Sequence, residues 1–339
     1  MSIFLSGIQP SSQTVQLGNY IGAILNWKKT VNNLKKEDRC YFMLPDLHAM
    51  TTVKSRDVLH DNIKKLIATY IACGIEPNDN VVFFQQSKIP AHCELCWILS
   101  TITPVGQLER MTQFKDKKNK LSLDEVNAGL LYYPILMVAD IILYKANFVP
   151  VGEDQKQHVE FTRDIVQKFI NIYGNGEKND LFVLPEAMID KTGKRIMSLG
   201  DGTKKMSKSV GEDKDKIFLT DTDEQIAKKI KTAKTDSIMG IYYDKENRPE
   251  VSNLINIFSA LTNRTVEDIS NEYREKNTKS FKDDLTQLLI NEIKPIREKQ
   301  NQLLKNDAYL EEIITKGNKI ANDVANDTLI KVKKAVGLL

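Results

Sequence analysis

Short apolar runs typical of β-strands alternate with segments of helical spacing through about residue 200 of this chain. Residues 39–44 and 81–86 are such apolar runs, and residues 57–72 carry apolar side chains at the spacing of an amphipathic helix. Strands that alternate with helices form a parallel sheet covered by helices on both faces. The sequence therefore predicts an α/β fold with a Rossmann-like, doubly wound parallel sheet.

The strand signals fade beyond about residue 222, where helical spacing takes over. Apolar residues recur every three or four positions in 254–261, 285–293 and 313–324. The length of 339 residues also exceeds that of one usual core. We therefore expect two domains, an α/β domain over residues 1–215 and an α-helical domain over residues 216–339.

The overall composition bounds the class of protein. The apolar fraction of 41% is ordinary for a globular chain, and no run approaches the roughly 20 apolar residues needed to span a bilayer. The N-terminal run is too short for a signal peptide, so we expect a cytoplasmic protein without membrane contact. The net charge is only +3, so any nucleic-acid contact must use a local patch.

The four cysteines are Cys40, Cys73, Cys93 and Cys96. Cys93 and Cys96 follow His92 at a spacing that suits a metal or redox site, but no second such pair completes four ligands. Residues 91–99 are apolar and helical in spacing, so we favour buried thiols over a metal site. We expect neither a structural metal nor a disulfide framework.

A basic segment near the middle of the chain suits phosphate binding. Lys205 and Lys208 lie between hydroxyl side chains, with glycines on both sides. Lysine supplies a compact charge with three donors, and glycine permits movement. The segment can close on a polyphosphate, although a solvated basic loop has the same composition.

The N-terminus predicts a second phosphate-facing element. A short apolar run at residues 2–6 leads into a turn rich in Gly, Pro and Ser, and then into a helix from about residue 17 to about residue 36. Such a turn presents backbone N–H groups to a phosphate, although an ordinary strand-to-helix connection looks the same. Neither a Walker loop nor a GxGxxG sequence occurs. Because ligands bind at the carboxyl ends of parallel strands, we place residues 7–18 in the binding crevice.

Together the two ends resemble the bacterial tryptophanyl-tRNA synthetases, a class I aminoacyl-tRNA synthetase family. The basic segment 205–209 reads KMSKS, and residues 7–11 and 17–23 resemble the region of that family that contains its HIGH sequence. The resemblance covers essentially the whole chain. Further matching stretches are residues 106–115, 139–144, 149–158 and 195–199.

Two departures from the family stand in the first of these regions. Ser12 occupies a position where the family usually has glycine, and the stretch 11–18 is one residue longer than expected. Residues 16–19 replace the HIGH sequence, and Gln16 stands where the family carries His or Thr. Glutamine can donate a neutral hydrogen bond to a phosphate oxygen but is never cationic.

The resemblance implies a tryptophan–tRNA ligase that uses ATP with Mg²⁺, L-tryptophan and tRNA(Trp). It also implies a homodimer and places the anticodon-binding surface in the helical domain. The implied catalytic residues are Lys205, Lys208, Asn19, Gln16 and Lys117. The implied ATP-binding residues are Gln9, Pro10, Ser11, Gly18, Asn19, Gly152, Glu153, Asp154, Ile196, Lys205, Met206, Ser207, Lys208 and Ser209.

Asp140 is the sharpest candidate for amino-acid recognition, because it is the lone charge in the apolar run 134–143. A buried carboxylate is costly unless it is paired, so a structural Asp satisfied by a lysine or a backbone donor is the alternative. At the matching position of the family, Asp receives the indole N–H of tryptophan. The other tryptophan-binding residues that the resemblance implies are Gln155, Tyr133, Met137, Val149, Val151 and His48.

Three alternatives stay open on the sequence. A tyrosyl enzyme would share the fold and the KMSKS loop, but residues 108–114 and 152–158 resemble the tryptophanyl family. A synthetase-like protein that only binds RNA or a partner would be consistent with Gln16 and the altered stretch 11–18. A small nucleotidyltransferase would not need the long helical C-terminal region.

Overall fold

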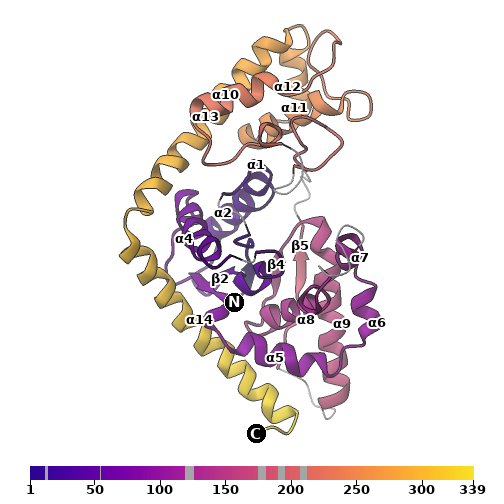
Figure 1. Ribbon diagram of the computed structural model, residues 1–339, viewed down its shortest axis with the longest axis vertical. Coiled ribbons are helices and arrows are strands. Elements are labelled where there is room, and N and C mark those ends of the chain that lie inside the picture. The colour runs from indigo at the N-terminus through magenta and orange to yellow at the C-terminus, as the bar shows by residue number, and fades with distance from the viewer. Residues whose placement is uncertain (12–13, 54, 119–125, 175–180, 190–194, 207–211) are drawn as a thin grey trace.

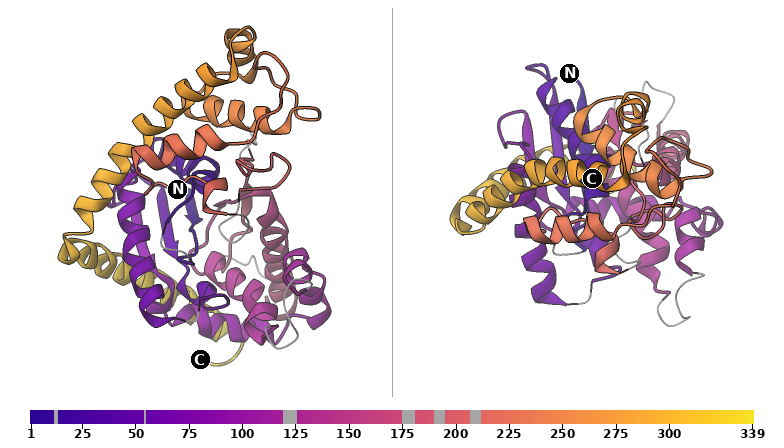
Figure 2. Two further views of the ribbon diagram at one scale, coloured as in Figure 1. Left: turned by 45° about the horizontal axis from the view of Figure 1, so that its top comes forward. Right: turned by 90° about the horizontal axis from the view of Figure 1, so that it is seen from above.

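The computed structural model describes residues 1–11, 14–53, 55–118, 126–174, 181–189, 195–206 and 212–339. The molecule is elongated, with a sheet and its helices at one end and a helical cluster at the other (Figure 1). Two long helices run along one side and connect the two ends (Figures 1 and 2).

The described residues form a five-stranded parallel sheet with the strand order β3-β2-β1-β4-β5. The order reverses between β1 and β4, and ligands of such sheets bind outside the carboxyl ends of the strands at this switch point. The predicted Rossmann-like parallel sheet is therefore confirmed. The strands are β1 Ile3–Ser6, β2 Arg39–Leu44, β3 Val81–Gln85, β4 Phe148–Pro150 and β5 Glu186–Met188.

Helices cover both faces of the sheet because side chains alternate along its strands. In β2, Cys40 and Phe42 join one buried cluster, while Tyr41 and Met43 join the other. The first cluster includes helices α1 Leu17–Asn19, α2 Leu25–Asn32 and α4 Arg56–Ala72, with a π-helical turn Tyr20–Ile24 between α1 and α2. The second includes α5 Ala91–Ser100, α8 Ala128–Ile142 and α9 Lys156–Tyr173.

The helix expected to end near residue 36 ends at Asn32. The carboxylate of Asp38 accepts hydrogen bonds from the backbone N–H groups of Ser2, at 2.7 Å, and Lys35, at 3.1 Å. This bonding turns the chain toward β2 and takes the place of a further helical turn. Three short helices complete this part of the molecule: α3 Asp46–Ala49, α6 Val105–Glu109 and α7 Thr112–Lys118.

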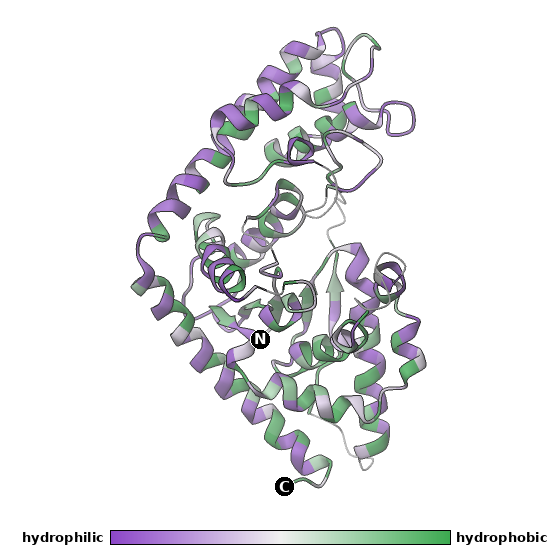
Figure 3. Ribbon diagram, in the orientation of Figure 1, coloured by the Kyte–Doolittle hydropathy of each residue, from purple (hydrophilic) through white to green (hydrophobic). Residues whose placement is uncertain are grey.

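Residues 216–339 are predominantly helical, as the spacing predicts. Thr222, Thr265, Asn277 and Asn306 each cap a helix N-terminus by accepting a backbone N–H. The two longest helices carry mixed polar and apolar faces (Figure 3). The helices are α10 Asp223–Thr232, α11 Pro249–Thr262, α12 Val266–Tyr273, α13 Thr278–Leu303 and α14 Asp307–Ala335.

Helix α14 returns to the sheet and covers its edge strand. The side-chain oxygen of Asn318 accepts the backbone N–H of Gln85 at 2.8 Å, and Ala321 and Leu329 join the cluster of α5 and α8. An edge strand presents unpaired backbone groups, so this cover protects β3. The last helix thus packs with the α/β part, whereas the division of functions at residue 215 stays a prediction. Within the described residues, we find no helix with the length and apolar character of a membrane span.

Candidate active site

The turn after β1 is fixed at the carboxyl edge of the sheet. A Cβ on Gly7 would lie 2.2 Å from the backbone oxygen of Met43, so the close approach of these two segments requires glycine. The backbone oxygen of Pro10 accepts the side-chain amide of Asn62 at 2.9 Å. The segment that the sequence assigns to ATP therefore begins at the switch point between β1 and β4.

The N-terminal helix and the start of the KMSKS segment meet beside this turn. The buried side chain of Gln16 donates from Nε2 to the backbone oxygen of Met206 at 3.0 Å. A Cβ on Gly18 would lie 3.8 Å from the Cβ atoms of Ile196 and Met206. The side-chain oxygens of Gln16 and Asn19 are buried, and neither has a partner among the described residues. Such orphaned atoms mark a place where a ligand can supply hydrogen bonds.

Lys205 and Asp154 join the segment to the turn after β4. The ammonium of Lys205 lies 3.5 Å from the carboxylate of Asp154, and both side chains are about half exposed. Burial alone would raise the pKa of Asp154, but the charge of Lys205, aided by a hydrogen bond from Gln155, outweighs it and lowers the pKa. The residues implied for ATP from three separate segments thus lie around one switch point.

Part of the predicted ATP site falls outside the described residues, namely Ser207, Lys208 and Ser209. Lys117 lies in α7, but its side chain is also outside the described part of the chain. Gln9 and Ser11 are half-buried on the turn after β1, and Gly152 and Glu153 are exposed on the turn after β4. The roles of all these residues stay predictions.

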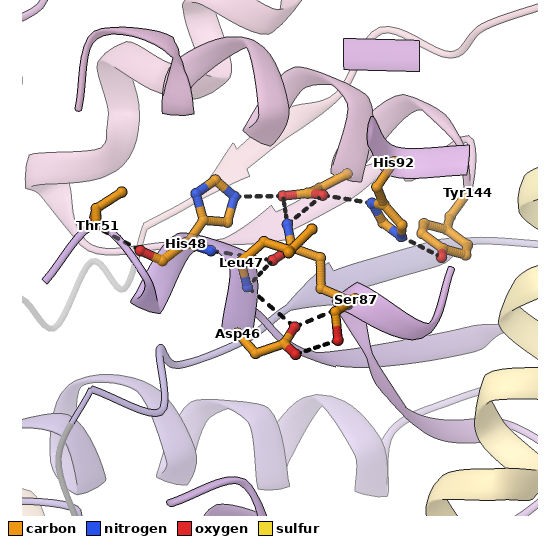
Figure 4. Close-up of polar contacts among 9 residues, drawn as sticks. Asp46, Leu47, His48, Thr51, Ser87, His92 and Tyr144 are labelled. Atoms are coloured by element: carbon orange, nitrogen blue, oxygen red, sulfur yellow. Dashed lines mark hydrogen bonds and ion pairs between the residues drawn. The ribbon is translucent and has the colours of Figure 1, made fainter. Parts of the chain in front are cut away.

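Asp140 lies at the centre of a buried polar cluster, of which Figure 4 labels His48, His92 and Tyr144. Its side chain is 1% exposed on α8. His48 Nε2, on α3, lies 2.7 Å from one carboxylate oxygen, and His92 Nδ1, on α5, lies 2.6 Å from the other. The amide nitrogen of Gln86, after β3, donates to both oxygens at 2.8 and 3.0 Å. Its partners are therefore two histidines and a glutamine, where the sequence suggested a lysine or a backbone donor.

The charge state of Asp140 follows from these partners. Burial alone would raise its pKa, but the charge and hydrogen bond of His48, with those of His92, outweigh it and lower the pKa to about 2. Asp140 is thus ionised at neutral pH and accepts hydrogen bonds only. Each imidazole then presents an N–H to the carboxylate.

A second layer of hydrogen bonds holds these partners. The side-chain oxygen of Gln86 accepts the backbone N–H groups of Leu47 at 3.1 Å and His48 at 3.4 Å. Asp46 accepts the backbone N–H of Ser87 at 2.9 Å and also the hydroxyl of Ser87. These bonds tie the end of β2 to the end of β3, as Figure 4 shows for Asp46 and Ser87. The orientation of His48 is therefore fixed by both strand ends.

The other residues implied for tryptophan lie on α8, β4 and the turn that follows β4. The ring of Tyr133 is edge-on to that of His48 at 6.1 Å, and its hydroxyl contacts His158 Nε2 at 3.0 Å. Val149 is buried, while Tyr133, Met137 and Val151 are partly buried against the same apolar cluster. Gln155 is half-buried beside Asp154. Substrate contact by these residues stays a prediction.

His92 and Gln86 are partners of Asp140 that the sequence did not predict. His92 stands out only beside the cysteines, and Gln86 only as the end of an apolar run. In α5, His92 and Leu95 face the sheet, so Cys93 is exposed and Cys96 is half-buried. The expectation of buried thiols is therefore wrong for Cys93. Across the described residues, no group of three or more His, Cys, Asp or Glu is placed to hold a metal ion.

Comparison with known proteins decides the family. A family model described as tRNA synthetases class I (W and Y) matches residues 1–293. A tryptophan–tRNA ligase of Bacillus anthracis is 46% identical over 338 residues, which cover 100% of this chain and 98% of the relative. The chain belongs to the tryptophan–tRNA ligase family. The family model spans tryptophan and tyrosine enzymes alike, so the identity to tryptophan enzymes distinguishes the two.

Solved structures of the family share the fold over the whole chain. Tryptophanyl-tRNA synthetase of Mycoplasma pneumoniae matches with a TM-score of 0.84 and 31% identity, covering 99% of this chain and 98% of that one. The Campylobacter jejuni enzyme, complexed with ADP and tryptophan, matches with a TM-score of 0.81 and 33% identity, covering 99% of both chains. The family, the fold class and the ligase activity predicted from the sequence are confirmed.

Proposed function

We propose that this member of the tryptophan–tRNA ligase family activates L-tryptophan with ATP at the β1–β4 switch point and passes it to the 3′ end of tRNA(Trp). The proposal rests on three segments that meet at this switch point: the turn after β1 with the helix that follows it, the start of the KMSKS segment, and the turn after β4. Gln16 contacts Met206, and Lys205 contacts Asp154, at the carboxyl edge of the sheet. The similar Campylobacter jejuni enzyme, complexed with ADP and tryptophan, supports a nucleotide and tryptophan here.

The first step joins tryptophan to the α-phosphorus of ATP. A carboxylate oxygen of tryptophan attacks that phosphorus, the bond to the β-phosphate oxygen breaks, and pyrophosphate leaves with the electron pair. No protein nucleophile is needed, so catalysis consists of positioning and charge stabilisation. The ammonium of Lys205, with that of Lys208, is suited to stabilise the charge that develops on pyrophosphate.

The second step consumes the adenylate. A terminal ribose hydroxyl of tRNA attacks the acyl carbon, and AMP leaves with the electrons of the acyl–phosphate bond. Mg²⁺ would be bound through the ATP phosphates, since the described part of the site offers amides and Lys205 and few of the carboxylates that Mg²⁺ prefers. When bound, Mg²⁺ would neutralise phosphate charge.

Selection of tryptophan rests on Asp140. As an ionised carboxylate in a buried site, it can accept the indole N–H. A side chain without that donor would forgo a charge-assisted hydrogen bond to this carboxylate. Tyrosine carries its only polar side-chain group at the far end of a different ring, so it cannot replace the indole N–H.

We propose that the chain binds a second copy of itself and also binds tRNA. Trp97 on α5 is 69% exposed, and Val105 nearby in the sequence is also exposed. Exposed large apolar side chains favour a protein interface, and the family resemblance implies a homodimer. The helical region 216–339 is proposed to carry the anticodon-binding surface, and a cytoplasmic location stays a prediction.

The test is charging of purified tRNA transcripts. We expect radiolabelled tryptophan to become acid-precipitable with tRNA(Trp) and not with tRNA(Tyr), at a rate that depends on ATP. Charging of tRNA(Tyr) with tyrosine would overturn the assignment in favour of the tyrosyl enzyme. Binding of tRNA(Trp) without any charging would favour the non-catalytic alternative that Gln16 left open.

A further inference from the structure

A hydrogen-bonded chain leads from Asp140 into the protein interior. His92 is 0% exposed; its Nδ1 lies 2.6 Å from Asp140, and its Nε2 lies 2.9 Å from the hydroxyl of Tyr144. Tyr144 is also fully buried, between Tyr41 and Phe84. His92 lies on α5, Asp140 lies on α8, and Tyr144 lies just after the end of α8.

We propose that His92 and Tyr144 are positioning residues for tryptophan selection, which hold the Asp140 carboxylate in the orientation that accepts the indole N–H. The inference rests on the proposed tryptophan site. His92 and Tyr144 act through Asp140 and do not touch the substrate.

The directions of the protons support this chain. Because Asp140 only accepts, the Nδ1 of His92 carries a proton that it donates to the carboxylate. The other ring nitrogen of His92, Nε2, is hydrogen-bonded to the hydroxyl of Tyr144 at 2.9 Å. Burial, followed by the nearby charge of Asp140, raises the pKa of Tyr144, so this hydroxyl keeps its proton. Hydrogen bonds therefore join Tyr144 to His92 and His92 to Asp140.

The two sides of the carboxylate have different surroundings. His48 holds one oxygen and lies beside Tyr133, which is partly buried and belongs to the proposed tryptophan pocket. His92 holds the other oxygen from the fully buried side, with Tyr144 beyond it. Figure 4 shows His48 and His92 on opposite sides of the cluster, with Tyr144 next to His92. The pair Tyr144–His92 therefore fixes the carboxylate from behind the pocket.

Orientation matters because a hydrogen bond weakens steeply when it is misaligned. Without His92, the carboxylate keeps His48 and the forked bond from Gln86, but the oxygen that faces His92 loses its shortest hydrogen bond and can turn more freely. The bond from His92 restricts this turn, and Tyr144 restricts the ring of His92. Loss of either should therefore reduce discrimination for the indole N–H, an effect that simple loss of packing does not produce.

The test compares tryptophan with its sulfur isostere 3-(benzothiophen-3-yl)alanine, which has no N–H. The measured quantity is the ratio of the two kcat/KM values in ATP–pyrophosphate exchange, with folding checked by thermal melting. We expect Tyr144→Phe and His92→Leu to lower this ratio by about tenfold, the loss expected for one charge-assisted hydrogen bond. His92→Asn, whose amide replaces the Nδ1 donor, should retain more of the ratio than His92→Leu.

Two further variants separate the possible outcomes. Tyr273→Phe removes the hydroxyl of another buried tyrosine, which donates to the carboxylate of Asp284 at 2.7 Å on a distant helix, and should leave the ratio unchanged. Asp140→Asn should collapse the ratio. If Asp140→Asn collapses the ratio, while Tyr144→Phe and His92→Leu stay folded and keep the wild-type ratio, the positioning role is overturned and the tryptophan site stands. If Asp140→Asn keeps the ratio, or the wild type shows no tryptophan-dependent exchange, the tryptophan site itself fails.

Discussion

At the scale of single residues, the site depends on how a buried charge is held. Asp140 is removed from water, which would cost several kcal/mol if it were unpaired. Donors from His48, His92 and Gln86 offset this cost. The same carboxylate can therefore serve both stability and recognition. A change of pH tests its contribution to stability, and substitution of its partners tests its part in recognition.

The pH dependence of stability follows from the lowered pKa of Asp140. A carboxyl whose pKa is lower in the folded state stabilises the protein above its unfolded pKa of about 3.9, and this contribution is lost as pH falls toward about 2. We expect the gap in unfolding free energy between wild type and Asp140→Asn to shrink between pH 5 and pH 2. Urea unfolding at closely spaced pH values measures it, and a gap independent of pH in this window would contradict the lowered pKa.

The sequence could identify Asp140 but not its partners. A lone charge in an apolar helical run stands out, because burial of a charge needs an explanation. Its partners lie on separate elements: His48 follows β2, Gln86 follows β3, and His92 lies at the start of α5. They approach Asp140 only because of the order of the strands in the sheet. Similarly, Gln16 stood out as a departure, but its bond to Met206 spans 190 residues of sequence and carries no local signal.

At the scale of elements, the contact of α14 with β3 determines whether the sheet edge is covered. A Cβ on Gly317 would lie 1.8 Å from the backbone oxygen of Phe83, so helix and strand touch without an intervening side chain. The helical spacing of α14 was visible in the sequence. Its docking site was not, because the contacting residues are a glycine and the polar Asn318, which look like a solvent-facing stretch.

Gly317→Ala tests this contact. The added methyl group must push α14 away from β3, and overpacking of this kind costs about 1–3 kcal/mol or more. We expect a lower midpoint of urea unfolding. Gly22→Ala is the matched control, because a Cβ there meets nothing within 4 Å, and it should change stability by less than about 1 kcal/mol. Equal midpoints for wild type and Gly317→Ala would show that the helix does not dock so closely.

At the scale of the whole molecule, the helical region holds the chain before and after the KMSKS segment. Asn253 on α11 accepts the backbone N–H of Met197 at 2.7 Å and donates to its oxygen at 2.9 Å. On the far side of the segment, Asp221 is held by Lys229 of α10 at 2.9 Å and, through its backbone oxygen, by Arg297 of α13. The position of Lys205, which pairs with Met197, is therefore set by a helix that lies outside the sheet.

Asn253→Ala should lower the rate of adenylate formation more than it lowers tryptophan affinity. The substitution frees the backbone of Met197, which forms an isolated β-bridge with Lys205, and a misplaced catalytic group can cost up to about 100-fold in rate. Single-turnover kinetics and tryptophan titration measure the two quantities. Ser252→Ala is the control. Ser252 precedes Asn253 and is equally buried, but among the described residues its hydroxyl bonds only the backbone N–H of Asp244. A rate unchanged by Asn253→Ala would mean that the segment is positioned by other contacts.

We propose that one site of this protein joins ATP to tryptophan and to no other amino acid. The most direct measurement is ATP–pyrophosphate exchange with each of the twenty amino acids in turn. The arrangement of Lys205, Asp154 and Asp140 predicts exchange with tryptophan alone. Exchange with tyrosine, or no exchange by a folded protein that still binds ATP, would contradict it.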